Sequence, residues 1–394
     1  MINLVISQFL RRRHLAWALS VALVLFGAWS WTQMTVEAYP DLGDVTVQVT
    51  TQVNGLASEE MEQQITTPLE RALSNTPGLA SIRSSSTFGL SLITLTFKDG
   101  TDDYFARQRV TERIGQVSLP AGAQPGLGPV AGPAGEIYRY TLESDRMNLM
   151  ELSELQRWKV IPALKQVAGV VDVNNFGGFT REFQLELDPA RLQAHGLVLN
   201  DVVTAINNGS ANAGGGRIAR GEQSYVVRGI GQIRSLDDLG AVMVSNSGGA
   251  PVLVRDLGRL QFGHQERGGI LGKNTDPDTI EGIVLMLKYE NPSRVLEGVH
   301  RKIDALQAEL APLGVRIVPY IDRDDLVKLT VDKVTRTVLE GMALVCFVLI
   351  LFLGSPRSAV VAAMAIPMSL VTVFIVMHFT RMPANLFSLG AIDF

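Results

Sequence analysis

The residue most suited to chemistry is Asp393, a carboxylate inside an apolar stretch that is compatible with a helix. The stretch covers residues 385–394, and Asp393 is its only ionisable side chain. Burying a carboxylate among apolar groups is costly, and carboxylates inside membranes usually belong to ion or proton pathways. The alternative is a carboxylate close enough to the surface to stay hydrated. We interpret Asp393 as a proton relay residue that loads and releases protons.

Metal-binding side chains of other types form no recognisable pattern. The five histidines are scattered without the spacing of metal ligands, and the single cysteine, Cys346, lies in an apolar run where it is expected to pack as a small hydrophobe. Met364 and Met368 lie four residues apart on one predicted helix and would suit Cu(I), which prefers soft thioethers. Plain packing in a membrane helix is the other interpretation of this methionine pair.

Enzymatic chemistry and nucleic-acid binding have no support in the sequence. No Walker sequence and no strand–GxGxxG–helix arrangement is present, and no nucleophile–base–acid signature stands out. The net charge is −4 and no long run of one sign occurs, so a nucleic-acid partner is not expected. We expect neither a catalytic site nor a bound cofactor.

Apolar segments near both ends predict membrane helices. Residues 1–38 combine a basic stub with an uncharged run long enough to span a bilayer, although a cleaved signal peptide is an alternative. Residues 336–354 and 358–380 predict two further helices, the latter with a kink at Pro367, and residues 385–394 begin a fourth. A helix that short cannot cross a bilayer, which needs about 20 residues. We therefore expect the chain to be an N-terminal fragment of a longer protein.

Between these helices the chain reads as soluble α+β structure. Residues 39–130 predict a strand, a helix, a hairpin that turns at Phe88-Gly89 and a second helix. This order matches most of a ferredoxin-like split β-α-β unit. The same order restarts after a stretch rich in proline and glycine, within residues 131–179, and closes far downstream within residues 268–335. Residues 180–267 are therefore predicted to be an insert, and the two units to be copies of one small fold.

This layout and several short motifs resemble the resistance-nodulation-division (RND) efflux pumps, in particular the cobalt-zinc-cadmium type of their heavy-metal efflux branch. The motifs that carry the resemblance are Tyr39-Pro40-Asp41, Gly78-Leu79, residues 97–102, residues 104–108, residues 135–138, Gly177-Gly178-Phe179 and residues 389–394. The likeness covers essentially the whole chain, and the motifs keep the order that they have in the family.

The resemblance implies a proton-driven antiporter that exports divalent heavy-metal cations across the bacterial inner membrane. Such pumps are homotrimers in the lipid bilayer, joined to a periplasmic adaptor protein and an outer-membrane channel. The two ferredoxin-like units would be periplasmic porter subdomains, and residues 180–267 would be a docking subdomain that forms half of a funnel. Within it, residues 212–222 resemble the loop that reaches into the neighbouring subunit.

The resemblance also suggests roles for individual residues. Asp393 matches the first acidic position of a fourth-helix motif in the cobalt-zinc-cadmium type, where it belongs to a carboxylate set implicated in proton coupling. Glu136 and Asp172 resemble positions where zinc pumps place metal ligands in a cleft; the alternative for each is a solvated carboxylate at a turn or strand edge.

The expected cargo follows from two departures from the copper/silver pumps. Those pumps carry methionine where Phe387 stands and a small apolar residue at the Asp393 position, so the sequence favours Zn²⁺, Co²⁺ or Cd²⁺. Three alternatives stay open: a membrane-anchored periplasmic interaction module without transport activity, a copper/silver pump, or an RND pump for organic substrates.

Overall fold

The structure, a computed structural model, describes most of the chain. Contacts between residues divide the chain into two compact units. The described residues are 13–34, 37, 43–132, 134–246, 249–353, 355–380, 382–385, 387–388 and 391. The first unit contains residues 1–146, 156–175 and 281–394, and the second contains residues 147–155 and 176–280. The first unit holds the first sheet, most of the second sheet and the apolar helices, and the second unit includes the range of the predicted insert, residues 180–267.

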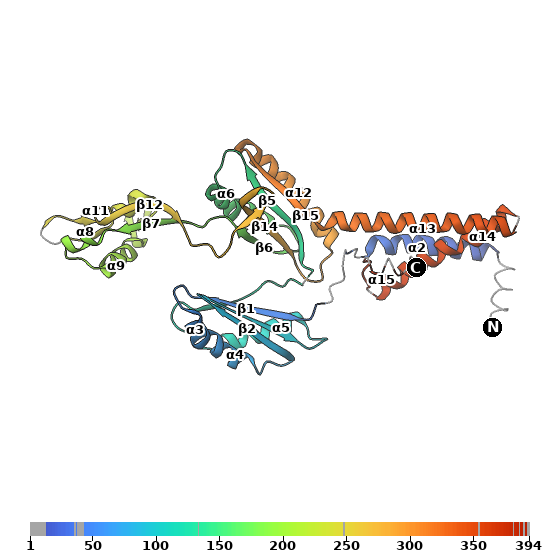
Figure 1. Ribbon diagram of the computed structural model, residues 1–394, viewed down its shortest axis with the longest axis horizontal. Helices are drawn as coiled ribbons and strands as arrows, with labels where there is room; N and C mark the ends of the chain where they lie inside the picture. Colours follow the sequence, from blue (N-terminus) through green and yellow to red (C-terminus); the bar gives the residue numbers. More distant parts are fainter. Residues whose placement is uncertain are drawn as a thin grey trace. The chain divides into compact units, whose positions relative to one another are not determined.

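The first sheet has the strand order β2-β3-β1-β4, and every neighbouring pair is antiparallel. Its strands are β1 (Thr46–Gln52), β2 (Leu79–Thr87), β3 (Leu90–Phe97) and β4 (Gln124–Leu127). Its helices are α3 (Ser58–Met61), α4 (Thr67–Leu73) and α5 (Asp103–Ile114), with a π-helical turn, Glu62–Thr66, between α3 and α4. The chain order is β-α-β-β-α-β (Figure 1). The predicted hairpin is confirmed, and Gly89 supplies the positive φ, +69°, that its turn requires.

Alternation along the strands and helical spacing along the helices place one hydrophobic core on one face of this sheet. Val47, Val49, Ile93, Leu95 and Phe97 point inward from β1 and β3, and Met61, Ile65, Leu69, Leu73, Ala106 and Val110 meet them from the helices. The side chain of Asp102 caps α5, because its Oδ1 accepts a hydrogen bond of 2.7 Å from the Phe105 amide. The alternation along the strands and the cap at the start of α5 thus both favour the observed packing of the helices on this face of the sheet.

The second sheet repeats this plan with an interruption. Its order is β6-β14-β5-β15, with a short β13 (Leu271–Lys273) also beside β14. The main strands are β5 (Glu136–Ser144), β6 (Val170–Gly177), β14 (Asp276–Met286) and β15 (Val315–Asp322). Its helices are α6 (Leu149–Leu155), α7 (Ile161–Leu164) and α12 (Pro292–Leu310), with a π-helical turn, Gln156–Val160, between α6 and α7. In the sheet β6 pairs with β14, but β14 begins about a hundred residues after β6 ends.

One irregularity occurs at the same place in both sets of elements. The helix after the first strand of each sheet contains a π-helical turn. The helical segment that follows this turn has a proline as its second residue, Pro68 in α4 and Pro162 in α7. Proline has no amide hydrogen to donate, so the helical hydrogen bonding must change just before it. A shared order of elements, a shared order of strands and a shared irregularity are what two copies of one small fold would give.

The second unit is built around a long antiparallel pair, β7 (Arg181–Leu187) with β12 (Gly258–His264). Between these strands lie α8 (Pro189–Ala194), α9 (Leu199–Gly209), β8 (Ala213–Arg220), β9 (Gln223–Gly229), α10 (Leu236–Gly240), β10 (Met243–Ser245), β11 (Val252–Leu253) and α11 (Val254–Leu257). The predicted loop at residues 212–222 contains strand β8 and the turn of a β-hairpin, β8–β9, whose residues are exposed along both strands. Its alternation was hidden because four small residues begin β8.

The Gly177-Gly178 pair turns the chain out of β6, and Gly178 has no room for a side chain. Its φ is +71°, and an added Cβ would lie 2.4 Å from Ser153 Oγ and 2.7 Å from Ile280 Cδ1. Gly178→Ala is therefore expected to lower the free energy of unfolding by about 2–5 kcal/mol, the sum of left-handed strain and overpacking. Thermal or denaturant unfolding of the purified protein measures this loss.

The matched control is Gly122→Ala, because Gly122 also has a positive φ, +91°, but no atom within 4 Å of the added Cβ. Only the backbone contribution, about 1–2 kcal/mol, should appear there. Equal losses in the two variants would contradict the packing part of the explanation.

Apolar helices occupy both ends of the described chain. They are α2 (Arg13–Gln33), α13 (Arg323–Leu353), α14 (Pro356–Ala363) and α15 (Ala365–Thr380). Among the described residues one helix, Arg323–Phe352, is long and apolar enough to cross a membrane, and α15 is a shorter apolar helix. The helix expected at residue 336 begins at Arg323 instead, because its charged first half continues the same helix without a break.

The third predicted helix is interrupted three residues before Pro367. Met364 lies between α14 and α15, because Pro367 cannot donate a hydrogen bond to the carbonyl of Ala363 and its ring crowds that carbonyl. The kink predicted from Pro367 is thus a break between two helices.

Helices α2 and α15 pack closely through a glycine. A Cβ on Gly27 would lie 2.1 Å from Val371 Cγ1, so only glycine permits this approach. The rings of Trp31 and Phe374 meet nearby with their centroids 4.7 Å apart.

Candidate functional site

Glu136 is the first residue of β5, and a cationic side chain of the same strand already holds its carboxylate. Arg139 donates from Nε to Glu136 Oε2 over 3.1 Å, and its Nη2 donates to the same oxygen. The Glu136 side chain is nevertheless 44% exposed, so it is open to solvent. The hydrogen bond to Glu136 is the main reason why the pKa of Arg139 is raised.

Asp172 lies on β6 and is held in a similar way. Its Oδ1 is 2.7 Å from Lys165 Nζ, and the same oxygen accepts a hydrogen bond of 2.7 Å from the amide of Val173. The side chain is about one third exposed, at 32%. Both carboxylates singled out from the sequence therefore have a cationic partner and keep access to solvent.

The structure does not bring Glu136 and Asp172 together into a preformed metal site. Strand β14 separates β5 from β6, so the two carboxylates belong to strands about 10 Å apart. Within the part of the chain that the structure describes, no group of three or more histidine, cysteine or acidic side chains could hold a metal ion. A cation bound here would have to use these carboxylates singly or with groups outside the described residues.

A third carboxylate, Glu281 on β14, was missed in the sequence. Its side chain is only 3% exposed, and its Oε1 lies 3.4 Å from Arg139 Nη1 and accepts a hydrogen bond from the hydroxyl of Tyr320. The available signal was a single acidic residue followed by a strongly apolar run, Gly282–Met286, in a strand. A buried carboxylate is costly unless it is paired and hydrogen-bonded, and Arg139 and Tyr320 supply both conditions.

Tyr320 reaches Glu281 because β15 is irregular at that point. The pairing of β15 with β5 shifts between Pro319 and Ile321, so Tyr320 is the extra residue of a β-bulge. Burial first, and then the hydrogen bond to Glu281, raises the pKa of Tyr320, so its hydroxyl remains a donor at neutral pH. Glu136, Arg139, Glu281 and Tyr320 thus form one connected group, which we call the Arg139 cluster.

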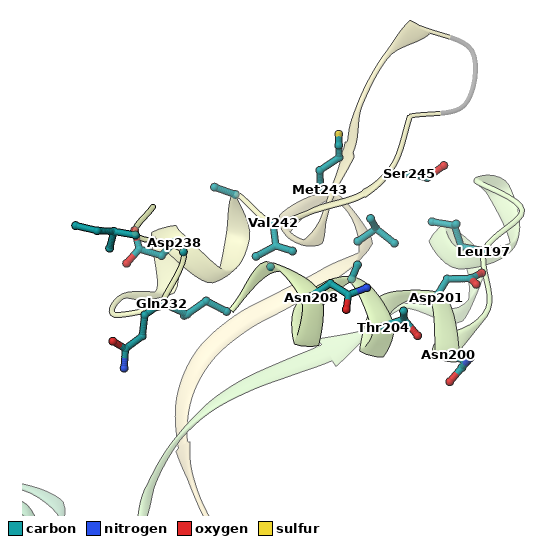
Figure 2. Close-up of a pocket in the computed structure, with 17 residues that line it drawn as sticks. Leu197, Asn200, Asp201, Thr204, Asn208, Gln232, Asp238, Val242, Met243 and Ser245 are labelled. Atoms are coloured by element: carbon teal, nitrogen blue, oxygen red, sulfur yellow. The ribbon is translucent and has the colours of Figure 1, made fainter. Parts of the chain in front are cut away.

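A large pocket lies elsewhere, in the second unit, and its carboxylates already accept hydrogen bonds from backbone amides. It has a volume of about 1180 Å³ between α9 and the segments at residues 230–233 and 241–245. Figure 2 shows Asp201, Thr204 and Asn208 along α9, facing Val242 and Met243. Asp201 Oδ2 accepts from the amide of Val198, and Asp238 Oδ2 accepts from the amides of Arg234 and Ser235.

These two aspartates serve as helix caps. The hydrogen bond from the amide of Arg234 is the main cause of the lowered pKa of Asp238. The pocket therefore offers amide and hydroxyl groups rather than free carboxylates, and it is a poor candidate for a cation site.

Asp393, the predicted proton relay residue, lies outside the residues that the structure describes. The start of its predicted helix is described in part. Asn385 Oδ1 accepts hydrogen bonds from the amides of Phe387, at 3.0 Å, and Ser388, at 2.9 Å. This is the pattern of a residue that caps a helix N-terminus, and it lies where the sequence predicts that the fourth helix begins.

Comparison with known proteins decides the family. Residues 5–394 match the AcrB/AcrD/AcrF family. The chain belongs to this family. The RND family expected from the motifs is thereby confirmed, and the similar proteins within it are heavy-metal efflux proteins.

Two relatives and one solved structure illustrate the likeness of this AcrB/AcrD/AcrF family member. Over 405 residues it is 37% identical to the cobalt-zinc-cadmium resistance protein CzcA of Cupriavidus metallidurans strain CH34. Over 397 residues it is 37% identical to the cation efflux system protein CusA of Escherichia coli strain K12. Each alignment covers 100% of this chain and 38% of the relative. The crystal structure of a heavy metal efflux pump, in crystal form II, matches with 56% sequence identity and a TM-score of 0.93, covering 99% of this chain and 39% of the pump.

The AcrB/AcrD/AcrF chain therefore spans about two fifths of the length of the relatives it matches, 38% for both CzcA and CusA. These relatives are named for cation efflux and for cobalt, zinc and cadmium resistance.

Proposed function

We propose that this chain belongs to an inner-membrane, proton-driven exporter of divalent heavy-metal cations such as Zn²⁺, Co²⁺ and Cd²⁺. The observation that supports this most strongly is similarity along the whole chain to proteins named for cation efflux and for cobalt, zinc and cadmium resistance. Two solvent-accessible carboxylates, Glu136 and Asp172, are the ligands proposed for the cation on its way through the periplasmic part. Oxygen ligands suit such borderline divalent ions better than Cu(I).

A copper or silver exporter is the second candidate, and one observation favours it. The chain is as similar to CusA, at 37%, as it is to CzcA, so overall identity does not select the ion. Met364 and Met368 would supply soft ligands, and Met364 is placed at the break between α14 and α15. The acidic character of Glu136, Asp172 and Asp393 is the reason why we prefer divalent ions.

Assembly is proposed from the same likeness. The two sheets would be porter subdomains, the second unit would contribute to docking, and the full protein would act as a trimer with a periplasmic adaptor and an outer-membrane channel. The exposed hairpin β8–β9 carries apolar side chains that suit burial against a neighbouring subunit: Ile218, Tyr225 and Val226 are 58%, 52% and 72% exposed.

The proposed ligands are tested by Glu136→Gln and Asp172→Asn in the full-length protein. Both variants keep the shape of the side chain but lose the charge that binds the cation, so Zn²⁺ transport into vesicles should fall by about tenfold or more, as for altered metal sites elsewhere. The matched control is Glu143→Gln, on the same strand as Glu136 and partly exposed, at 36%, beside Arg316. Unchanged transport in both test variants would refute the ligand role of the two carboxylates. Absence of Zn²⁺ transport by the parent protein, with adaptor binding retained, would instead favour a membrane-anchored interaction module.

A further inference from the structure

The feature that carries a further inference is the position of Arg139 between two carboxylates. Its Nε and Nη2 donate to Glu136, which is 44% exposed, while its Nη1 faces Glu281, which is 3% exposed. The three residues involved come from adjacent strands β5 and β14, whose side-by-side placement is visible in Figure 1. One guanidinium is thus shared between a carboxylate open to solvent and a carboxylate buried in the sheet.

The two carboxylates differ in what else holds them. Glu281 keeps a second donor, the hydroxyl of Tyr320, and its burial makes a nearby positive charge necessary. Glu136 is exposed, so water or an arriving cation can replace Arg139 as its partner. Arg139 can therefore leave Glu136 without becoming unpaired, because the planar guanidinium already faces its second acceptor.

We propose that Arg139 is a built-in competitor for the cargo: it neutralises Glu136 while the site is empty and turns fully to Glu281 when a divalent cation binds. This inference rests on the proposed role of Glu136 as a ligand. A transporter needs binding that is strong enough to admit the ion but weak enough to release it. Competition by a resident cation weakens the site, and the alternative acceptor keeps the cost of displacing that cation small. Arg139 is a positioning residue that sets affinity rather than a ligand.

The test measures Zn²⁺ affinity directly, without transport, by competition between the purified full-length protein and a chromophoric chelator. Arg139→Gln is expected to tighten Zn²⁺ binding by about tenfold, the lower range of effects that outer-shell groups have on metal affinity. Glu281→Gln is expected to weaken Zn²⁺ binding, because Arg139 then has Glu136 as its remaining carboxylate partner in the cluster and competes more strongly with the cation. General damage to the site would weaken binding in both variants.

Two further variants guard against misfolding and an unspecific charge effect. The double variant Arg139→Gln/Glu281→Gln removes both charges of the buried pair, so it should remain folded and bind Zn²⁺ as tightly as Arg139→Gln alone. Arg316→Gln removes a guanidinium from the same sheet, 3.7 Å from Glu143, and should leave Zn²⁺ affinity unchanged.

The outcomes separate this inference from the function on which it rests. If Glu136→Gln weakens Zn²⁺ binding but Arg139→Gln and the double variant do not tighten it, competition by Arg139 is refuted and the ligand role of Glu136 stands. If Glu136→Gln leaves Zn²⁺ affinity unchanged, the ligand role fails and the inference fails with it. Tightening by Arg139→Gln together with weakening by Glu281→Gln is the result that supports the proposal.

Discussion

Asp393→Asn in the full-length protein is expected to abolish heavy-metal resistance without lowering the amount of protein in the membrane. Asparagine has nearly the shape of aspartate but cannot take up and release a proton, so a relay through this position would stop. A carboxylate inside an apolar helix is rare in membrane proteins because of its cost, and it usually persists where ions or protons must pass. Resistance of a metal-sensitive host, together with immunodetection of the membrane protein, measures both parts of this expectation.

Asp332→Asn is the control for this prediction. Asp332 is an exposed residue of α13, so neutralising it should leave resistance intact. If Asp393→Asn cells grow at the same metal concentration as the parent, Asp393 is not part of the relay and the hydrated-carboxylate interpretation holds.

The elements of the fold that depend on local periodicity could be predicted from the sequence. The alternation of Ile93, Leu95 and Phe97 and the spacing of Met61, Ile65 and Leu69 place β3 and the first helix within a few residues. The π-helical turns were not predictable in the same way, because one extra residue per turn hardly disturbs a hydrophobic pattern of this length. Only the repeated proline after each turn, Pro68 and Pro162, hints at them.

The candidate site was predictable only as separate residues. Resemblance pointed to Glu136 and Asp172, but their cationic partners follow from the fold: Lys165 meets Asp172 only after the chain turns from α7 into β6. Glu281 lies 142 residues after Arg139 in the sequence. Its contact depends on β14 returning beside β5 after the insert and on a bulge in β15, neither of which leaves a local pattern.

A second large effect is expected at a buried ion pair within the first unit. Lys288, just after β14, has its Nζ 3.3 and 3.2 Å from the two carboxylate oxygens of Asp103, the first residue of α5. The two side chains are 7% and 8% exposed. Lys288→Met is expected to lower the free energy of unfolding by about 3–5 kcal/mol, because it leaves the Asp103 carboxylate buried without its cation. Lys328, paired with Asp324, has a side chain that is 71% exposed, so Lys328→Met should cost about 1 kcal/mol or less.

The stabilisation of the folded protein by the Lys288–Asp103 pair depends on pH in a defined direction. Burial lowers the pKa of Lys288, but the hydrogen bond to Asp103 and its charge outweigh burial, so the pKa is raised. A group whose pKa is higher in the folded state stabilises the protein fully below its unfolded pKa, about 10.4 for lysine. The stabilisation is then lost as the pH rises through the folded-state value, so the difference between the parent and Lys288→Met should shrink only at strongly alkaline pH.

The double variant Lys288→Met/Asp103→Leu distinguishes stability from positioning. Removing both charges should restore most of the lost stability, since a buried ion pair often adds little over apolar side chains of similar size. The hydroxyl of Tyr289, which donates to Asp103 Oδ2 over 2.7 Å, belongs to a residue that is 78% exposed, so water can replace that acceptor. If the double variant is as unstable as Lys288→Met, the pair itself holds the structure together. If stability returns but metal resistance does not, the role of the pair is to position α5 against the chain that follows β14.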